Sequence, residues 1–317
     1  MSHNNRKPKM LPYTLKHFQK QFPDDAICLE WLRNYLYPDG IYCTKCEATT
    51  KHHRVVSRPS YSCDHCGHHV HPTAGTIFHK SPTPLTTWFY AIYLMAQTRC
   101  GISAKQIQRE TGVTYKTAWR MFKQIRSMLD ETEKGEKLGG SQKPVEVDET
   151  YYGGRQRQSG RASRFDKKAK TPVVGLVQRK GSVRAFVTAD VKKDTLHGLI
   201  KEHVMPQNLV FTDDFVAYDG LDYGQRFHHR RIRHSEKIYV AGDVHTQTIE
   251  GFWSLVKNGI KGVYHSVGRH YLQTYLNEYS FRYNRRFDEQ PMFTSFLQQI
   301  EKRDAVVRRE PQMAEAF

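Results

Sequence analysis

The chain has 317 residues, enough for about two domains that each bury a core of their own. It carries 49 Lys and Arg against 32 Asp and Glu, and the net charge of +17 favours a polyanionic partner such as nucleic acid over a generally basic soluble protein. Its 18 Tyr and 16 Phe provide ample core material and argue against a disordered basic protein. The longest apolar run, residues 88–96, is shorter than the roughly 20 residues that span a bilayer, and no secretory signal is visible, so we expect no membrane partner.

An N-terminal segment, residues 1–40, is expected to form two short helices between residues 13 and 37. Asp24 or Asp25 is placed to cap the second of them, because a carboxylate there can accept from the free backbone N–H groups of the first turn. We assign both helices to packing.

A zinc ribbon is predicted for residues 41–80. Two pairs of cysteines stand there in Cys-x2-Cys spacing, and two such pairs can surround one ion with four thiolates, which makes a closed, structural zinc site. Such an ion can supply about 10–16 kcal/mol of apparent folding free energy. Four neighbouring histidines offer an alternative, in which an imidazole replaces one thiolate. The four thiols are those of Cys43, Cys46, Cys63 and Cys66, and the histidines are His65, His68, His69 and His71. Cys28 and Cys100 lack such partners and are expected to be small buried side chains.

Residues 81–130 are predicted to be helical and to include a helix-turn-helix. After an apolar helix at 84–98, a short helix at 104–110, a turn at 111–114 and a helix at 115–129 have the spacing of that motif. The last helix has an apolar stripe of Ala118, Phe122, Ile125 and Leu129. On its outer face we expect Lys116, Arg120 and Lys123 to contact DNA, although a merely solvated basic face is the alternative.

A polar linker, residues 131–144, leads to a second domain at 145–290. The second domain begins with the stretch Val145–Tyr152, where Val145 and Val147 alternate with Glu146 and Asp148 as in a strand with one buried face. Asp148 is expected where this strand ends. The basic loop that follows carries Arg155 and Arg157, which are expected to hold phosphates unless the loop has no binding role. Strands at 172–178 and 183–190, a helix at 194–204 and a strand at 208–215 come next, and a peripheral helix and tail occupy residues 291–317.

This order of elements predicts an α/β domain of the ribonuclease H-like kind, with a mixed sheet flanked by helices. The ends of its first and fourth strands lie side by side, so Asp148 and Asp213 should converge although 65 positions separate them. Asp214 is the rival of Asp213, but its side chain should point to the other face of the strand. A third acid, Glu250, borders the apolar stripe of a helix within residues 245–262, which also carries Lys257 and Lys261. A merely exposed helix glutamate is the alternative for Glu250.

Several long motifs make the chain resemble the zinc-ribbon DDE transposases of bacterial insertion sequences. They include, in order, the two Cys-x2-Cys pairs, GISAKQIQRETGVTYKTAWRMFKQIR, VEVDETYYGG, FTDDFVAY, HTQTIEGFWSLVKNGIKG and YLNEYSFRYNRR. The resemblance implies that Asp148, Asp213 and Glu250 form a catalytic triad, with Lys257 as the basic residue seven places after the third acid.

The same resemblance implies what the protein binds and where it acts. Two Mg2+ (or Mn2+) ions per active site and a structural Zn2+ are expected as cofactors. The expected partner is double-stranded DNA, both the terminal inverted repeats of the element and the target. The protein should act as a homodimer or higher oligomer on DNA, in the bacterial cytoplasm at the nucleoid. Water would first cut the element's end, and the freed 3′-OH would then attack target DNA. A non-catalytic, domesticated DNA-binding regulator and a ribonuclease H-like nuclease without strand transfer are the alternatives.

Overall fold

A computed structural model describes residues 12–132, 136–140, 143–153, 170–232 and 246–301. They divide into two compact units. The first, called here the sheet unit, comprises Thr98–Ser103 and Leu129–Glu289, and the second, called the helical unit, comprises Leu11–Gln97, Ala104–Met128 and Gln290–Phe317. None of the described helices is long and apolar enough to cross a membrane.

The helical unit is built around aromatic side chains. Phe22 contacts Phe89 edge to face, with 4.9 Å between ring centroids, and Phe293 packs on Phe22 and Phe18. Its helices are α1 (Leu15–Gln21), α2 (Asp25–Leu36), α3 (Leu85–Gln97), α4 (Ala104–Thr111), α5 (Tyr115–Ser127) and α9 (Met292–Leu297).

Asp24 and Asp25 have separate tasks in this unit. Asp24 caps α2, because its Oδ1 accepts from the backbone N–H of Ile27 at 2.9 Å. Asp25 instead accepts from the backbone N–H and the hydroxyl of Thr86, at 2.8 and 2.7 Å, and so ties the start of α2 to α3.

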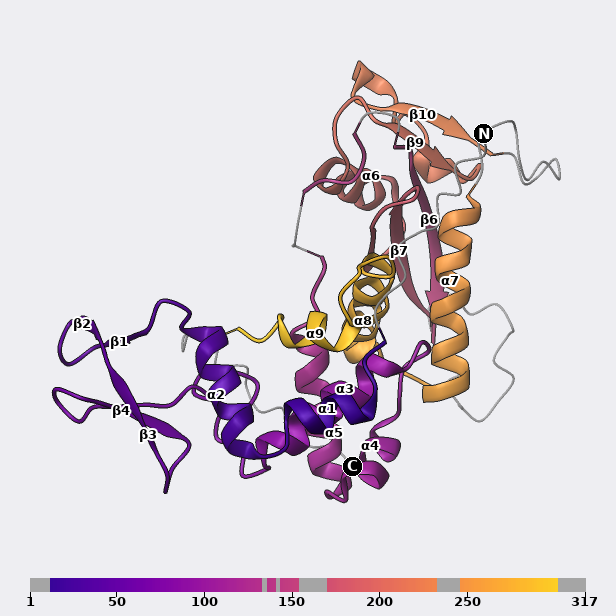
Figure 1. The fold of residues 1–317 in the computed structure, drawn as a ribbon. Helices are drawn as coiled ribbons and strands as arrows, with labels where there is room; N and C mark the ends of the chain where they lie inside the picture. The colour runs from indigo at the N-terminus through magenta and orange to yellow at the C-terminus, as the bar shows by residue number, and fades with distance from the viewer. Residues whose placement is uncertain (1–11, 133–135, 141–142, 154–169, 233–245, 302–317) are drawn as a thin grey trace, which may run out of the picture. The chain divides into compact units, whose positions relative to one another are not determined.

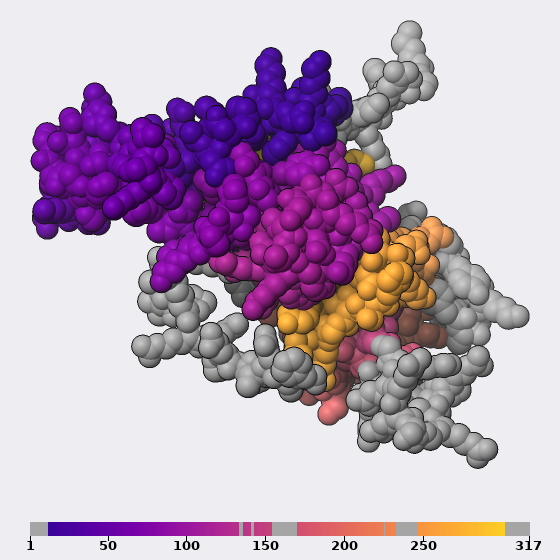
Figure 2. Space-filling view, turned by 90° about the horizontal axis from the view of Figure 1, so that it is seen from below, coloured from indigo at the N-terminus to yellow at the C-terminus, as the bar shows by residue number. Residues whose placement is uncertain are grey.

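A small module of short strands holds the two Cys-x2-Cys pairs. Its strands pair antiparallel in two sheets, β1–β2 and β3–β4–β5, and Figures 1 and 2 show it as a lobe of its own beside α2. The strands are β1 (Ile41–Cys43), β2 (Ala48–Thr50), β3 (His52–Val55), β4 (Ser60–Cys63) and β5 (His69–Val70).

The sheet unit is a mixed α/β fold with five strands in the order β10-β9-β6-β7-β8 (Figure 1). The first three in sequence, β6, β7 and β8, form an antiparallel meander, and β9 joins the other edge of β6 in parallel. This is the order and direction that the ribonuclease H-like prediction requires. The elements are β6 (Val145–Tyr152), β7 (Thr171–Gln178), β8 (Val183–Val187), α6 (Lys193–His203), β9 (Leu209–Thr212), β10 (His228–Arg231), α7 (Gln247–Gly259) and α8 (Leu272–Asn284).

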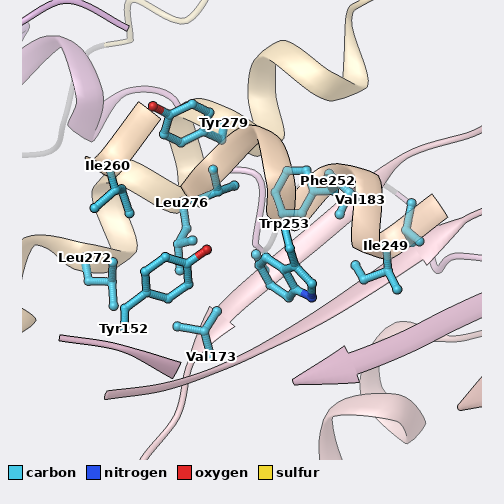
Figure 3. Close-up of a cluster of buried hydrophobic side chains, with 13 residues drawn as sticks. Tyr152, Val173, Val183, Ile249, Phe252, Trp253, Ile260, Leu272, Leu276 and Tyr279 are labelled. Atoms are coloured by element: carbon cyan, nitrogen blue, oxygen red, sulfur yellow. The ribbon is translucent and has the colours of Figure 1, made fainter. Parts of the chain in front are cut away.

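Helices cover both faces of this sheet. Val145 and Val147 of β6 pack with α6 on one face, whereas Tyr152 packs with α7 and α8 on the other (Figure 3). Gly175 of β7 lets α7 approach, because a Cβ atom there would lie 2.5 Å from the ring of Trp253. Gly175 is directly opposite Asp148 in the β6–β7 ladder, so the indole of Trp253 can reach the face of the sheet on which Asp148 lies.

One expectation about this unit was wrong, and one strand was not predicted. β6 does not end at Asp148 but continues to Tyr152, because β7 pairs with it over its whole length. Asp148 lies instead just past the last residue that β6 pairs with β9, which is Glu146. The strand β10 was not predicted, since its sequence His228–Arg231 is almost entirely basic.

Candidate active site and metal centre

Strand β6 presents acidic side chains to both faces of the sheet. Glu146 and Asp148, two residues apart, both contact α7, where Glu146 accepts from Thr248 and Asp148 from Trp253. Glu149 points to the opposite face, where its Oε2 accepts from the hydroxyl of Tyr218 at 2.8 Å. The period of two in a strand thus divides the acids between the two helix layers.

The register of β6 and β9 brings Asp148 and Asp213 together. Glu146 is paired with Phe211 in a parallel ladder, and Asp148 and Asp213 follow two residues later on their respective strands. Asp213 is close enough to raise the pKa of both Asp148 and Glu149 by repulsion between carboxylates. Its own Oδ1 accepts from the backbone N–H of Phe215 at 3.1 Å, which fixes the side chain at the start of the turn after β9.

Asp148 has a strongly perturbed carboxyl group. Its pKa is raised from 3.8 to about 7, first by burial and then by the negative charges of Glu149 and Asp213. The indole N–H of Trp253 donates to its Oδ2 at 3.0 Å and opposes that rise. A carboxylate with these neighbours is stabilised by a cation, which would remove the repulsion between the acids.

Glu250 lies on the first turn of α7, one turn before Trp253. Its side chain is exposed, and its Oε1 accepts from the hydroxyl of Thr246 at 3.1 Å. Because residues three apart lie on the same side of a helix, Glu250 borders the edge of α7 from which Trp253 reaches Asp148. Among the described residues, however, the three acids are not gathered as tightly as the cysteines considered below.

Glu146 is a site residue that the sequence did not single out. It is completely buried, forms an ion pair with Arg179 at 2.6 Å, and accepts from the backbone N–H groups of Thr248 and Ile249 at 2.8 and 3.1 Å. A carboxylate at the positive end of a helix both satisfies free N–H groups and interacts favourably with the helix dipole. Glu146 therefore fixes the start of α7, and with it the position of Glu250. The sequence feature that could have identified Glu146 is an acidic residue two places before Asp148, on the same face of the predicted strand.

The predicted DNA-contacting residues are distributed over several parts of the chain. Lys116, Arg120 and Lys123 are all exposed on α5, while Lys257 is half-buried near the end of α7. Arg155 and Arg157 lie outside the described residues, and Lys261 is exposed in the π-helical turn Ile260–Tyr264 that follows α7.

Four thiols form a compact cluster in the strand module. The sulfur atoms of Cys43, Cys46, Cys63 and Cys66 all lie within 4.8 Å of one another and could hold a metal ion. The Cys43–Cys66 and Cys46–Cys63 distances are 3.5 and 3.8 Å. A tetrahedral site with Zn–S bonds of about 2.3 Å separates its sulfurs by roughly 3.8 Å, so the cluster fits zinc.

The two remaining cysteines and the four neighbouring histidines lie outside this cluster. Four thiolate ligands are therefore favoured over a set in which a histidine replaces one of them. Cys28 is buried as predicted, but Cys100 is exposed, so the expectation of a buried Cys100 was wrong.

Comparison with known proteins identifies the family. Residues 137–284 match the ISXO2-like transposase domain. An uncharacterized transposase-like protein of Haemophilus influenzae is 31% identical over 105 residues, which make up 33% of this chain and 83% of that protein. The chain belongs to the ISXO2-like transposases.

A further relative covers most of this transposase. An uncharacterized protein in transposable element ISH50 of Halobacterium salinarum is 29% identical over 280 residues, covering 83% of this chain and 92% of its relative. Two solved structures, the Mos1 strand transfer complex and a pre-cleavage Mos1 transpososome, match 66% and 61% of the chain and 77% and 74% of their own chains. Both have a TM-score of 0.23 and 11% identity, which is too low to bear on the fold.

The family match covers one part of the transposase. Asp148, Asp213 and Glu250 all lie within the matched residues 137–284, whereas the four clustered cysteines and α5 precede them. The residues that match the family model therefore all lie in the sheet unit.

Proposed function

We propose that this transposase binds the ends of its insertion sequence, cuts DNA there and joins the freed end to target DNA. The observation that carries the proposal is the convergence of Asp148 and Asp213 at the junction of β6 and β9, beside the helix that bears Glu250. The transposase family suggests a polynucleotidyl transferase, and three carboxylates from three separate elements suit that chemistry.

The donor set fits divalent magnesium or manganese. Carboxylate oxygens are hard ligands, and the repulsion that raises the pKa of Asp148 reflects a surplus of negative charge that a cation would neutralise. Asp148, Asp213 and Glu250 would hold these ions. When bound, such ions would assist both the attacking and the leaving oxygen of a phosphodiester.

The remaining residues of the site position these ligands. Trp253 donates to Oδ2 of Asp148 and so ties this carboxyl group to α7. Glu146 holds the first turn of α7 against β6. Lys257, two turns beyond Glu250 on the same helix, is suited to contact a DNA phosphate and align the strand.

The helical unit would supply recognition of DNA. The four-thiolate cluster would hold a structural zinc ion and make the strand module a zinc ribbon. The helices α4 and α5 would form a helix-turn-helix, with Lys116, Arg120 and Lys123 on the recognition helix facing the DNA backbone or bases. Two element ends must be handled together, so the active assembly would contain at least two copies of the chain.

The test is an assay of cutting and joining on DNA that carries the element's ends. With Mg2+, the wild-type chain should nick at the element boundary and transfer the 3′-OH end to a plasmid. The variants Asp148→Asn, Asp213→Asn and Glu250→Gln should bind this DNA but lose cutting, while Asp214→Asn should retain it. Cutting without joining would identify a nuclease instead, and binding without any metal-dependent cutting would identify a regulator.

A further inference from the structure

A cavity of about 380 Å³ opens beside the end of β6 in the sheet unit. Its walls come from the last residues of β6, from Lys257 of α7 and from the turn that follows α7, and Lys170 closes it from the start of β7. Its size lies within the range of roughly 300–1,000 Å³ typical of small-molecule sites. It is therefore large enough to take a chemical group of a ligand rather than a single water.

The cavity carries a concentrated positive charge. Lys170, Lys257 and Lys261 all line it, and no Asp or Glu is among its described lining residues. Within the described part of the chain, none of these three lysines forms an ion pair. Lys257 and Lys261 stand four residues apart on consecutive turns, where like charges repel each other. Three cations with no acid among the described lining residues are stabilised by a bound anion.

The apolar wall of the cavity strengthens the attraction between its lysines and an anion. Its apolar side is formed by Tyr152, Ile260 and Leu272, which are 8%, 8% and 2% exposed and lie together at one end of the core cluster in Figure 3. Because this wall of the cavity is apolar, the charges of the lysines that line the rest of it are screened less than they would be in open solvent. His265 and Ser266 add hydrogen-bonding groups at the rim.

The backbone at this cavity has two uncommon features. The segment Ile260–Tyr264 forms a π-helix, and His265, which ends it, has φ of 60° and ψ of −43°. Single π-helical turns and non-glycine residues with positive φ are rare and concentrate at functional sites, where the surrounding structure maintains them. Both features occur in residues that line the cavity, independently of its charge.

We propose that this cavity binds a backbone phosphate of DNA, as an anchor separate from the three carboxylates. Lys257 lies seven residues after Glu250, and Tyr151 lies three after Asp148, so the cavity is about 10 Å from the acids along both elements. An anchor at this distance holds the strand a few nucleotides from the bond that is cut. The inference rests on the proposed function, since it assigns the anion to the DNA substrate of the same unit.

The test compares two double variants with equal reductions in charge. Lys170→Gln with Lys261→Gln removes charge from the cavity, whereas Lys193→Gln with Lys201→Gln removes it from exposed positions of α6 that do not line the cavity. Binding of the zinc-loaded protein to a fluorescein-labelled duplex of mixed sequence is followed by anisotropy over a salt series without added Mg2+ or Mn2+. Each lysine–phosphate interaction contributes about 0.9 to the steepness with which log K falls with log salt. We expect the cavity pair to reduce this steepness by about 0.9 to 1.8 and the α6 pair to keep the wild-type value.

A second pair of variants tests the space itself. Ser266→Trp fills the cavity without changing charge, and Ser254→Trp places the same ring on an exposed position of α7 outside it. Only Ser266→Trp should weaken binding, by about tenfold, because the ring would displace the phosphate from its charge-assisted hydrogen bonds. Melting temperatures of all four proteins verify that each is folded.

The outcomes separate this inference from the proposed function. Equal slopes for the two lysine pairs would overturn the phosphate anchor, even if Mg2+-dependent cutting is intact. A rise in melting temperature with inorganic phosphate that only the cavity pair abolishes, with DNA binding unchanged, would assign the cavity to a free anion and overturn it too. A reduced slope in the cavity pair, without any cutting by the wild type, would support the anchor and reject the catalytic proposal.

Discussion

Asp148 combines burial, repulsion and hydrogen bonding in one carboxyl group. Burial raises its pKa most, the charges of Glu149 and Asp213 add to the rise, and hydrogen bonds from Trp253 and the backbone of Glu149 oppose it, leaving a value of about 7. At neutral pH without metal, the group is thus near its own midpoint, and a bound cation would shift it to the charged form.

The pH dependence of stability should reveal this state of Asp148. Its pKa is higher in the folded than in the unfolded chain, so the folded state holds a proton that the unfolded state has released between pH 3.8 and about 7. In zinc-loaded protein without added Mg2+ or Mn2+, the free energy of unfolding should therefore fall through this range relative to that of Asp148→Asn, by up to about 4 kcal/mol. Above about pH 7 the two plots of unfolding free energy against pH should run parallel. Urea unfolding at a series of pH values measures the difference. A constant difference between the two proteins would contradict the raised pKa.

Candidate acids could be selected from the sequence, but their surroundings could not. Asp148, Asp213 and Glu250 could be selected because each stands beside a clear strand or helix pattern. The hydrogen bond from Trp253 could not, since nothing in a helix pattern indicates which buried side chain turns its polar atom toward the sheet. Trp253 does lie in the core, as predicted from its place in the apolar stripe, yet it also contacts the site.

At the scale of elements, the junction of β6 with α7 positions the site. Glu146 accepts three hydrogen bonds from Thr248 and Ile249 and pairs with Arg179 without any exposure of its own side chain. The helix that bears Glu250 is therefore attached to the strand that bears Asp148 by a buried charge.

Removing that charge should loosen α7. Glu146→Gln leaves Arg179 without its carboxylate, and removal of one partner of a buried ion pair costs about 3–5 kcal/mol. Glu202→Gln is the control, because Glu202 is 71% exposed and a change there should stay within about 0.5 kcal/mol. Urea unfolding followed by Trp fluorescence measures both. Equal stability of the two variants would show that Glu146 does not hold the helix.

Helix α5 should contribute most of the electrostatic attraction to DNA. Lys116→Ala, Arg120→Ala and Lys123→Ala each remove an exposed cation from its outer face without touching the buried stripe of Ala118, Phe122 and Ile125. Each variant whose cation binds a phosphate should reduce the salt slope of binding by about one. Anisotropy measurements on the element's end DNA test this. Three unchanged slopes would remove α5 from the interface.

The sheet order was predictable because alternation and turn residues mark β6, β7 and β8, and a helix separates them from β9. The end of β6 was misplaced since it depends on its partner strand: β7 continues to pair with it beyond Asp148 to Tyr152. Strand β10 was missed for a related reason. Its basic sequence shows little alternation, and it is a strand only because β9 offers it a free edge.

At the scale of the whole molecule, two units with different chemistry share one chain. The helical unit brings four thiols within 4.8 Å of one another, a donor set that suits zinc. The sheet unit carries the proposed carboxylate site, whose hard oxygen donors would suit Mg2+ or Mn2+ instead.

Zinc removal should affect the strand module selectively. Cys63→Ser, or treatment with a strong chelator, should abolish its cooperative melting, since the ion supplies about 10–16 kcal/mol of apparent stability to such modules. Cys100→Ser should have little effect because Cys100 lies outside the cluster and is exposed. Limited proteolysis within residues 41–80 and metal analysis measure the outcome. A module that resists protease without bound metal would show that its fold is independent of zinc.

The central claim is that Asp148, Asp213 and Glu250 hold divalent metal together, and counting bound Mn2+ by electron paramagnetic resonance tests it most directly. With zinc-loaded full-length protein above pH 7, the account predicts about two Mn2+ ions per chain for the wild type and for Asp214→Asn. It predicts at least one ion fewer in each of Asp148→Asn, Asp213→Asn and Glu250→Gln. Wild-type binding by any of these three, or a missing ion in Asp214→Asn, would contradict it.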